Sequence, residues 1–194
     1  MDRIFLPSGW RLYHFAELDS TNSEALRLLN SGEPEGAVVW ADRQIAGRGR
    51  RGRHWESLEG NLLVSFLLRP AVSYREASQL GFVMAVAASD AISAVIPNVA
   101  VTLKWPNDIL CGGRKTAGIL LESAGRTNGG PLGVAVGLGL NIRSAPIRTP
   151  YPATCLDHEG AQLEDRPEDL LSSIAENLNA RYQIWLRDGF GGVR

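Results

Sequence analysis

Apolar residues recur at helical spacing in some segments of the chain and form short continuous runs in others, which predicts helices alternating with strands. The polar residues 19–22 precede apolar residues at helical spacing that end near Gly32. We therefore expect a helix there, capped at its start by one of the polar side chains. The apolar run 37–41 predicts a short buried strand. Residues 61–68, NLLVSFLL, predict another strand, which Pro70 follows.

The second half of the chain continues this alternation. Residues 73–95 predict a long helix with a face of small side chains, and residues 101–105 predict a strand that Pro106 ends. Two further strands are expected at 115–122 and 132–140, joined by a glycine-rich turn at 129–131. A final helix is expected at 167–186, and Pro167 suits its first turn.

This order of elements predicts a fold of the α/β class, of the α+β type. We expect a mixed β-sheet flanked by helices rather than a doubly wound parallel sheet, because the predicted strands do not alternate regularly with helices. The sequence contains no internal repeat and no long run of charge. Residues 1–194 are therefore expected to form a single domain.

Composition narrows the class of protein. The formal net charge is −1, with 21% charged and 44% hydrophobic residues, so the bulk charge gives no reason to expect a nucleic-acid or anionic-membrane partner. The cysteines, Cys111 and Cys155, are far apart and lack CxxC spacing, so neither a disulfide framework nor a cysteine zinc site is expected. The N-terminus lacks a signal-like apolar core, and the apolar stretches are interrupted before membrane-spanning length. We expect a cytoplasmic protein without a membrane partner.

The Gly/Arg loop, residues 47–53 with the sequence GRGRRGR, is the most informative part of the chain. Its glycines let backbone N–H groups approach an anion closely, and its arginines carry forked donors that suit phosphate and carboxylate oxygens. Three interpretations stay open: a solvated basic loop, a nucleic-acid patch, and a lid over a phosphate-bearing ligand. The interspersed glycines and the flanking predicted strands favour the lid.

Three further segments place polar residues at the ends of predicted strands. Residues 104–108, KWPND, suit a binding edge, although an ordinary Pro-Asn-Asp turn explains the same pattern. Lys115 opens the next strand beside Gly118, whose missing side chain leaves room for a ligand or marks a bulge. Residues 137–141, GLGLN, open space along one strand face and end in Asn141. They lack the third glycine and the following helix of a dinucleotide fingerprint.

Taken in order, these segments resemble the catalytic domain of biotin protein ligases. The resemblance covers about residues 13–185 and implies the fold that these ligases share with lipoate ligases and, distantly, with class II aminoacyl-tRNA synthetases. It also implies a ligase that uses ATP to activate biotin as biotinyl-5′-AMP. The biotinyl group would then pass to a lysine of a biotin carboxyl carrier protein domain, such as the carrier subunit of acetyl-CoA carboxylase.

The resemblance further implies the residues of the site. Those that would bind biotin are Ser20, Thr21, Asn22, Gln44, Arg48, Gly49, Arg50, Lys115 and Gly118. Those that would bind the nucleotide are Arg50, Arg53, Trp55, Asn107 and Asn141. Arg50 and Lys115 are the candidate catalytic residues, because a carboxylate anion must approach the triphosphate polyanion. Mg²⁺ is the expected metal cofactor, and its ligands are not assigned.

Several expectations concern partners and alternatives. The motifs begin by Asp19 and the chain ends at Arg194, so neither an N-terminal helix-turn-helix domain nor a C-terminal β-barrel is expected, and with them no DNA binding. Strand-edge pairing with the carrier or in a homodimer stays open. The nearest alternative is a lipoate or octanoyl ligase, although neither Cys111 nor Cys155 lies in a motif suited to an octanoyl-transferase nucleophile. A non-enzymatic nucleic-acid-binding regulatory module is the more distant alternative.

Overall fold

A mixed β-sheet flanked by helices forms the centre of the structure, which confirms the predicted fold class. The structure is a computed structural model that describes residues 4–124, 132–161 and 167–193. The sheet has seven strands in the order β1-β2-β3-β7-β6-β5-β4. β1 pairs with β2 in parallel, whereas the other neighbouring strands pair antiparallel.

The helices and strands follow the predicted order, with additions. The strands are β1 (Arg11–Leu18), β2 (Ala37–Gln44), β3 (Leu62–Leu68), β4 (Val101–Lys104), β5 (Asp108–Cys111), β6 (Arg114–Ala124) and β7 (Gly133–Leu140). The α-helices are α1 (Thr21–Asn30), α2 (Tyr74–Ala77), α3 (Leu80–Val95) and α4 (Pro167–Asp188), with short 3-10 turns at Arg50–Gly52, Asp157–Glu159 and Phe190–Val193. The turn predicted at 129–131 lies outside the described residues.

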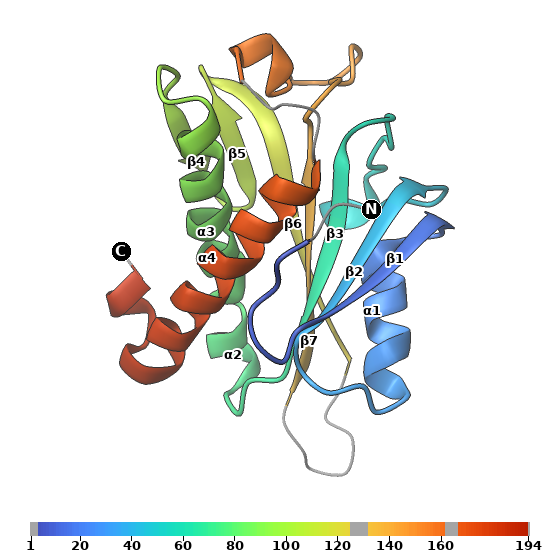
Figure 1. The fold of residues 1–194 in the computed structure, drawn as a ribbon, viewed down its shortest axis with the longest axis vertical. Helices are drawn as coiled ribbons and strands as arrows, with labels where there is room; N and C mark the ends of the chain where they lie inside the picture. Colours follow the sequence, from blue (N-terminus) through green and yellow to red (C-terminus); the bar gives the residue numbers. More distant parts are fainter. Residues whose placement is uncertain (1–3, 125–131, 162–166, 194) are drawn as a thin grey trace.

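The helices divide unequally between the faces of the sheet (Figure 1). α3 and α4 cover one face, and α1 lies on the other. The larger core packs between the sheet and α3–α4, where Phe66, Met84 and Ile92 are fully buried. A smaller core around Leu29 and Val39 lies under α1. Burial of apolar surface is the main stabilising term in such a fold, so the α3–α4 face anchors the sheet, and the face carrying α1 is left with room for a site.

Two strands in the structure were not predicted from the sequence. β1 lies at one edge of the sheet and has no fully buried residue, so its apolar residues lack the strict alternation that marks a half-buried strand. β5 has only four residues and follows the turn after β4 directly. Both strands depend on pairing with a neighbour, and the chain's local pattern does not reveal that pairing.

The helix predicted after residues 19–22 is α1, but its predicted side-chain cap is wrong. Ser20 is the N-cap residue with extended backbone, and its side chain makes no capping hydrogen bond. Instead, its N–H donates to the Asp19 carboxylate at 2.7 Å. Burial raises the pKa of Asp19, but hydrogen bonds from Arg27 and from this N–H outweigh it, so the net shift is downward. The start of α1 is thus held by an anion outside the helix.

The long helix predicted over residues 73–95 is two helices, α2 and α3. Ser73 begins α2 with a capping box, in which Glu76 returns the hydrogen bond. The Ser78 hydroxyl then donates to the Arg75 carbonyl at 2.6 Å. Such a local side-chain bond competes with the helical ladder, and the chain restarts as α3 at Leu80.

One helical segment is, by length and composition alone, long and apolar enough to cross a membrane. The segment is Tyr74–Val95, whereas the sequence was expected to hold no apolar stretch of that length. In the structure α3 packs against the sheet and α4, and its residues Val83, Met84 and Ala87 are fully buried. A core helix of this kind meets the same criteria as a membrane span.

A buried hydrogen bond ties α4 to the turn before β2. The Tyr182 hydroxyl donates to Glu35 Oε2 at 2.7 Å, and burial, together with that carboxylate, raises the pKa of Tyr182. Replacing Tyr182 with phenylalanine should lower the free energy of unfolding by about 1.5–3 kcal/mol, the contribution of a hydrogen bond to a charged group. Urea denaturation measures this, with Tyr74→Phe at an exposed position as the control. Equal stability of both variants would contradict the prediction.

Candidate active site

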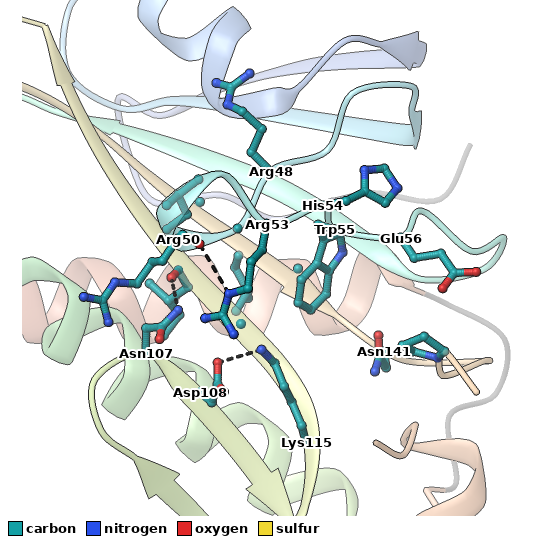
Figure 2. A pocket seen from close by; sticks show the side chains of 18 of the residues that line it. Arg48, Arg50, Arg53, His54, Trp55, Glu56, Asn107, Asp108, Lys115 and Asn141 are labelled. Atoms are coloured by element: carbon teal, nitrogen blue, oxygen red, sulfur yellow. Dashed lines mark hydrogen bonds and ion pairs between the residues drawn. The ribbon is translucent and has the colours of Figure 1, made fainter. Parts of the chain in front are cut away.

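Every residue that the sequence assigned to the site lines one cavity beside the start of α1. The cavity has a volume of about 390 Å³, within the roughly 300–1,000 Å³ common for small-molecule sites. The Gly/Arg loop, α1 and the ends of several strands surround it (Figure 2). The assigned residues that line it are Ser20, Thr21, Asn22, Gln44, Arg48, Gly49, Arg50, Arg53, Trp55, Asn107, Lys115, Gly118 and Asn141.

Strand register brings the glycines and Asp108 side by side. Gly139 of β7 pairs with Gly118 of β6, which also pairs with Asp108 of β5. In the next row on the same face, Gly137 pairs with Leu120. Side chains alternate between faces along a strand, so these positions all lie on the α1 face of the sheet. Only tertiary pairing unites these segments.

The Trp55 ring occupies the space above two of the glycines. A Cβ atom at Gly139 would lie 2.4 Å from Trp55 Cε2, and one at Gly118 would lie 2.8 Å from Trp55 Cζ3. The Trp55 ring fills the space directly above these glycines, and both glycines still line the cavity beside it. They allow the indole to pack flat on the sheet, and the ring and the glycines together form a wall of the cavity.

Buried polar side chains form a connected network at the α1 end of the cavity. The Thr21 N–H and hydroxyl donate to Gln44 Oε1 at 2.7 and 3.1 Å. The Ser65 hydroxyl lies 2.7 Å from Thr21 Oγ1 and 2.6 Å from Asn22 Oδ1. Asn22 Nδ2 donates to the Glu122 carboxylate at 2.9 Å. Polar groups fixed in this way discriminate strongly between ligands that complete their hydrogen bonds and ligands that do not.

Ser20 offers a free hydroxyl beside this network. The residue is 3% exposed and lines the cavity, and its hydroxyl forms no hydrogen bond with the described residues of the chain. A hydroxyl beside a cavity can donate one hydrogen bond and accept others. A polar ligand in the cavity would supply a partner.

The opposite end of the cavity is cationic. Lys115 Nζ pairs with Asp108 Oδ1 at 2.7 Å, and both side chains are partly buried. Figure 2 shows Arg50 and Arg53 on the same side as Lys115, while the Arg48 guanidinium points away from them. The cations that line the cavity, Arg48, Arg50, Arg53, Lys115 and Arg148, outnumber the carboxylates Asp108 and Glu56, and this excess of positive charge suits phosphate oxygens.

The Gly/Arg loop is a closed turn rather than an extended strand. The Gly49 N–H donates to the Arg53 carbonyl at 2.6 Å, and the Trp55 N–H donates to the Gly47 carbonyl at 2.9 Å. Arg51 at its tip has a φ of 59°, a left-handed conformation that is unfavourable for a residue with a side chain. Arg51 does not line the cavity, unlike Arg50 and Arg53.

Part of the segment after β7 also lines the cavity, and the sequence did not identify it: Pro146, Arg148, Thr149, Pro150, Tyr151 and Ala153. The Lys115 N–H donates to the Pro152 carbonyl at 2.8 Å, and the Thr154 N–H donates to the Lys115 carbonyl at 2.9 Å. This segment therefore fixes the backbone of Lys115, and it adds Arg148 to the lining. Its prolines indicated only a link, because they carry no periodicity.

The two assigned asparagines brace the walls of the cavity. Asn107 Nδ2 donates to the Ile119 carbonyl at 2.9 Å, and Asn141 Nδ2 donates to the Thr154 carbonyl at 3.1 Å. Both side chains thereby add to the backbone hydrogen bonds at these positions, such as that from the Ile119 N–H to the Asn107 carbonyl at 2.9 Å. Their remaining amide oxygens face the lining and stay available for a ligand.

A dedicated metal cage is not present in the described part of the chain, where no three His, Cys, Asp or Glu side chains group together. Asp108 and Glu56 are the carboxylates that line the cavity. Mg²⁺ typically binds through one or two carboxylates together with substrate phosphates. The donor set therefore fits a metal that arrives with a polyphosphate.

Comparison with known proteins gives a consistent result. Residues 15–141 match the profile of the Biotin/lipoate A/B protein ligase family. The chain is 42% identical over 186 residues to the biotin–[acetyl-CoA-carboxylase] ligase of Paracoccus denitrificans, covering 92% of this chain and 76% of the relative. It is 35% identical over 191 residues to the bifunctional ligase/repressor BirA of Bacillus subtilis, covering 96% of this chain and 58% of the relative.

A solved structure extends the similarity to three dimensions. The biotin protein ligase of Aquifex aeolicus in complex with biotin and ATP superposes with a TM-score of 0.74 at 30% identity. The match covers 94% of this chain and 76% of the Aquifex chain. The similarity therefore extends over nearly the whole chain.

Proposed function

The chain belongs to the biotin/lipoate A/B protein ligase family, and we propose that it is the catalytic domain of a biotin protein ligase that makes biotinyl-5′-AMP and transfers biotin to a carrier lysine. The observation that carries the proposal is the polarity of a single cavity. Fixed hydrogen-bonding groups around Thr21 and Asn22 lie at one end, and the cationic groups around Lys115 lie at the other. Biotin has a polar ring at one end and a carboxylate at the other.

The polar end of the cavity suits the ureido ring. The free Ser20 hydroxyl, Thr21, Asn22 and Gln44 supply donors and acceptors. Trp55 and Gly118 supply an apolar wall farther along the cavity, beside Lys115. A ring held by buried hydrogen bonds is oriented as well as bound. The valeryl chain then directs the carboxylate toward Arg50 and Lys115.

The cationic end suits the first half-reaction. A carboxylate oxygen of biotin attacks the α-phosphorus of ATP, the bond to the β-phosphate oxygen breaks, and pyrophosphate leaves. Lys115 and Arg50 offset the repulsion between the two anions, and their effect is largest where water is excluded. Arg53, Asn107 and Asn141 line the same cavity and are proposed to hold the nucleotide. Orienting the two reactants supplies much of the remaining acceleration.

The second half-reaction needs no enzyme nucleophile. The ε-amine of the carrier lysine attacks the carbonyl carbon of the mixed anhydride, AMP leaves, and the amine loses a proton. Until the carrier arrives, the Gly/Arg loop must keep water from the anhydride. We propose that Arg48, Gly49 and Arg50 form this cover.

Mg²⁺ fits the site as a companion of the triphosphate. Asp108 or Glu56 would hold it beside substrate phosphates. When bound, it would reduce the negative charge that the carboxylate meets.

The proposed partner is a biotin carboxyl carrier protein domain, and the exposed sheet edges offer a way to bind it. β1 and β4 form the two edges of the sheet. An unpaired edge accepts a strand from a partner, either from the carrier or from a second copy in a homodimer. We propose a cytoplasmic location, where such a carrier would be met. Sedimentation of the chain alone and with a carrier domain separates the two modes of pairing.

Calorimetric titration tests the proposed function directly. The purified chain is titrated with biotin and with lipoate, each with and without ATP and Mg²⁺. We expect biotin to bind, to bind more tightly with ATP and Mg²⁺, and to outcompete lipoate, because the network around Asn22 matches a ureido ring. Absence of biotin binding under both conditions would overturn the proposal, and tight lipoate binding would indicate the sister activity.

Replacing Arg50 with alanine should make the adenylate escape faster. The lost charge-assisted hydrogen bond corresponds to about 10- to 100-fold in the dissociation rate, measured as release of free biotinyl-5′-AMP. Arg51→Ala is the matched control, because Arg51 lies in the same loop but outside the cavity lining. Release from the Arg50 variant no faster than from wild type would contradict the role of Arg50 in the cover.

A further inference from the structure

Glu122 on β6 contacts both the polar network and the Gly/Arg loop, although it does not line the cavity. Its carboxylate accepts from Asn22 Nδ2 at 2.9 Å and pairs with Arg48 Nη2 at 3.2 Å. We infer that Glu122 is a positioning residue that couples the ring-binding network to the cover over the ligand. The identity of the ligand in this inference rests on the proposed function. The coupling between the network and the loop rests only on the contacts of Glu122.

The place of Glu122 in the sheet explains its reach. Gly118, Leu120 and Glu122 alternate along β6 and therefore share the α1 face. The first two line the cavity, so Glu122 lies just beyond its α1 end. From there its side chain reaches the first turn of α1 and, across from it, the Gly/Arg loop.

Glu122 sets the orientation of the Asn22 amide. Asn22 Nδ2 donates to the Leu120 carbonyl at 3.2 Å as well as to Glu122, while Asn22 Oδ1 lies 2.6 Å from the Ser65 hydroxyl. A flipped amide would place its oxygen against a carboxylate and a carbonyl, which only accept hydrogen bonds. The carboxylate of Glu122 thus decides which amide group faces Ser65 and the network.

Glu122 also sets the position of Arg48. Arg48 Nη2 donates to Ser23 Oγ at 3.0 Å and to the Glu122 oxygens at 3.2 and 3.3 Å. Figure 2 shows its guanidinium directed away from those of Arg50 and Arg53. Within the described ranges, no other arginine of the Gly/Arg loop pairs with a carboxylate. The repulsion among the arginine side chains of the Gly/Arg loop is therefore reduced at Arg48, where the Glu122 carboxylate offsets its charge.

The pair is too exposed to act mainly through stability. The Arg48 and Glu122 side chains are 39% and 29% exposed, and ion pairs at such positions contribute little to folding. The pair is instead expected to affect the geometry of the site. An oriented Asn22 amide fixes the Glu122 carboxylate, and the carboxylate then holds Arg48 and the Gly/Arg loop over the ligand. A purely structural carboxylate would not link these two groups.

Two variants separate the halves of the coupling. Glu122→Gln keeps an acceptor for Asn22 but removes the charge that holds Arg48, and Glu122→Ala removes both. Glu17→Ala is the matched control, because Glu17 pairs with Arg43 at 2.7 Å at exposed positions of β1 and β2, and neither residue lines the cavity. Thermal unfolding checks that all three remain folded.

The first measurement uses no ligand. Trypsin cleavage within the Gly/Arg loop should be roughly two- to fivefold faster in both Glu122 variants, as expected for loss of an exposed ion pair, because cleavage follows the open population. Glu17→Ala should leave the rate unchanged. Loop cleavage at the wild-type rate in both Glu122 variants would overturn the inference, whether or not the chain binds biotin.

The second measurement uses biotin and the adenylate. Glu122→Gln should bind biotin almost as tightly as wild type yet release biotinyl-5′-AMP faster, whereas Glu122→Ala should be impaired in both. Adding Arg48→Ala to Glu122→Ala should then increase release little further, because both changes break the same contact. Additive effects on release would overturn the coupling. If wild type binds no biotin, the proposed function fails instead, and the cleavage result alone decides the role of Glu122.

Discussion

Replacing Lys115 with alanine is expected to slow adenylate formation by about 10²- to 10³-fold, the usual effect of removing one preorganised donor from a transition state. Lys115 is the cation at the proposed reacting end of the cavity, and its backbone is fixed by hydrogen bonds to Pro152 and Thr154. Its effect should therefore fall on the rate of the chemical step more than on biotin affinity. Pyrophosphate release under saturating biotin and ATP measures that rate.

The ion pair with Asp108 provides the control for this prediction. Lys115→Ala leaves the Asp108 carboxylate without its cation, and this alone disturbs the site. Asp108→Asn breaks the same pair, 2.7 Å long, but keeps the lysine charge. We expect the asparagine variant to lose less than Lys115→Ala, because it keeps the lysine charge and removes only the carboxylate that pairs with it, one of the two candidate Mg²⁺ ligands. Equal losses in the two variants would show that the pair, and not the charge of Lys115, carries the effect.

Replacing Gly137 with alanine is expected to weaken biotin binding by roughly 10- to 100-fold, the effect of overpacking a fitted interior. The added Cβ would lie 2.4 Å from Asn22 Oδ1 and 3.0 Å from its Cγ. The Asn22 amide must then move away from Ser65 and Glu122, and the polar network loses its fixed orientation. Calorimetric titration with biotin gives the dissociation constant.

A matched glycine separates local crowding from the general effect of alanine. Gly191 has no atom within 4 Å of an added Cβ, so Gly191→Ala should leave biotin affinity unchanged. Asn22→Ala should reproduce the Gly137→Ala defect without crowding. Wild-type affinity in Gly137→Ala would mean that Asn22 does not orient the ligand.

Local pattern was sufficient for most of the fold. The helices α1 and α4 and the strands β2, β3, β6 and β7 all coincide with predicted segments, because each buries a continuous or periodic set of apolar residues. β1 and β5 were not predicted, because β1 is an exposed edge strand and β5 has only four residues. The split between α2 and α3 was not predicted, because only a two-residue turn at Ser78 and Gln79 separates them and neither Gly nor Pro marks it in the sequence.

The site was predicted as a set of residues but not as an arrangement. The assigned positions do line one cavity. They could be predicted because the residue types of the Gly/Arg loop and of residues 104–108 indicate anion binding without knowledge of the fold. Their individual roles stay predictions. The position of Trp55 above Gly118 and Gly139 was not foreseen, and neither was that of the segment from Pro146 to Ala153. Both are loop residues that tertiary contacts bring to the strands.

The sequence by itself determined the class of fold and the chemical inventory, since both depend on residue types and short-range spacing. Only the tertiary structure decided that Ser20 keeps a free hydroxyl, and only it decided that Glu122 joins Asn22 to Arg48. The physical reason is the sequence separation of the partners. A hydrogen bond between residues about a hundred positions apart leaves no trace in local periodicity, and it exists only once the strands have set the register that brings the two side chains together.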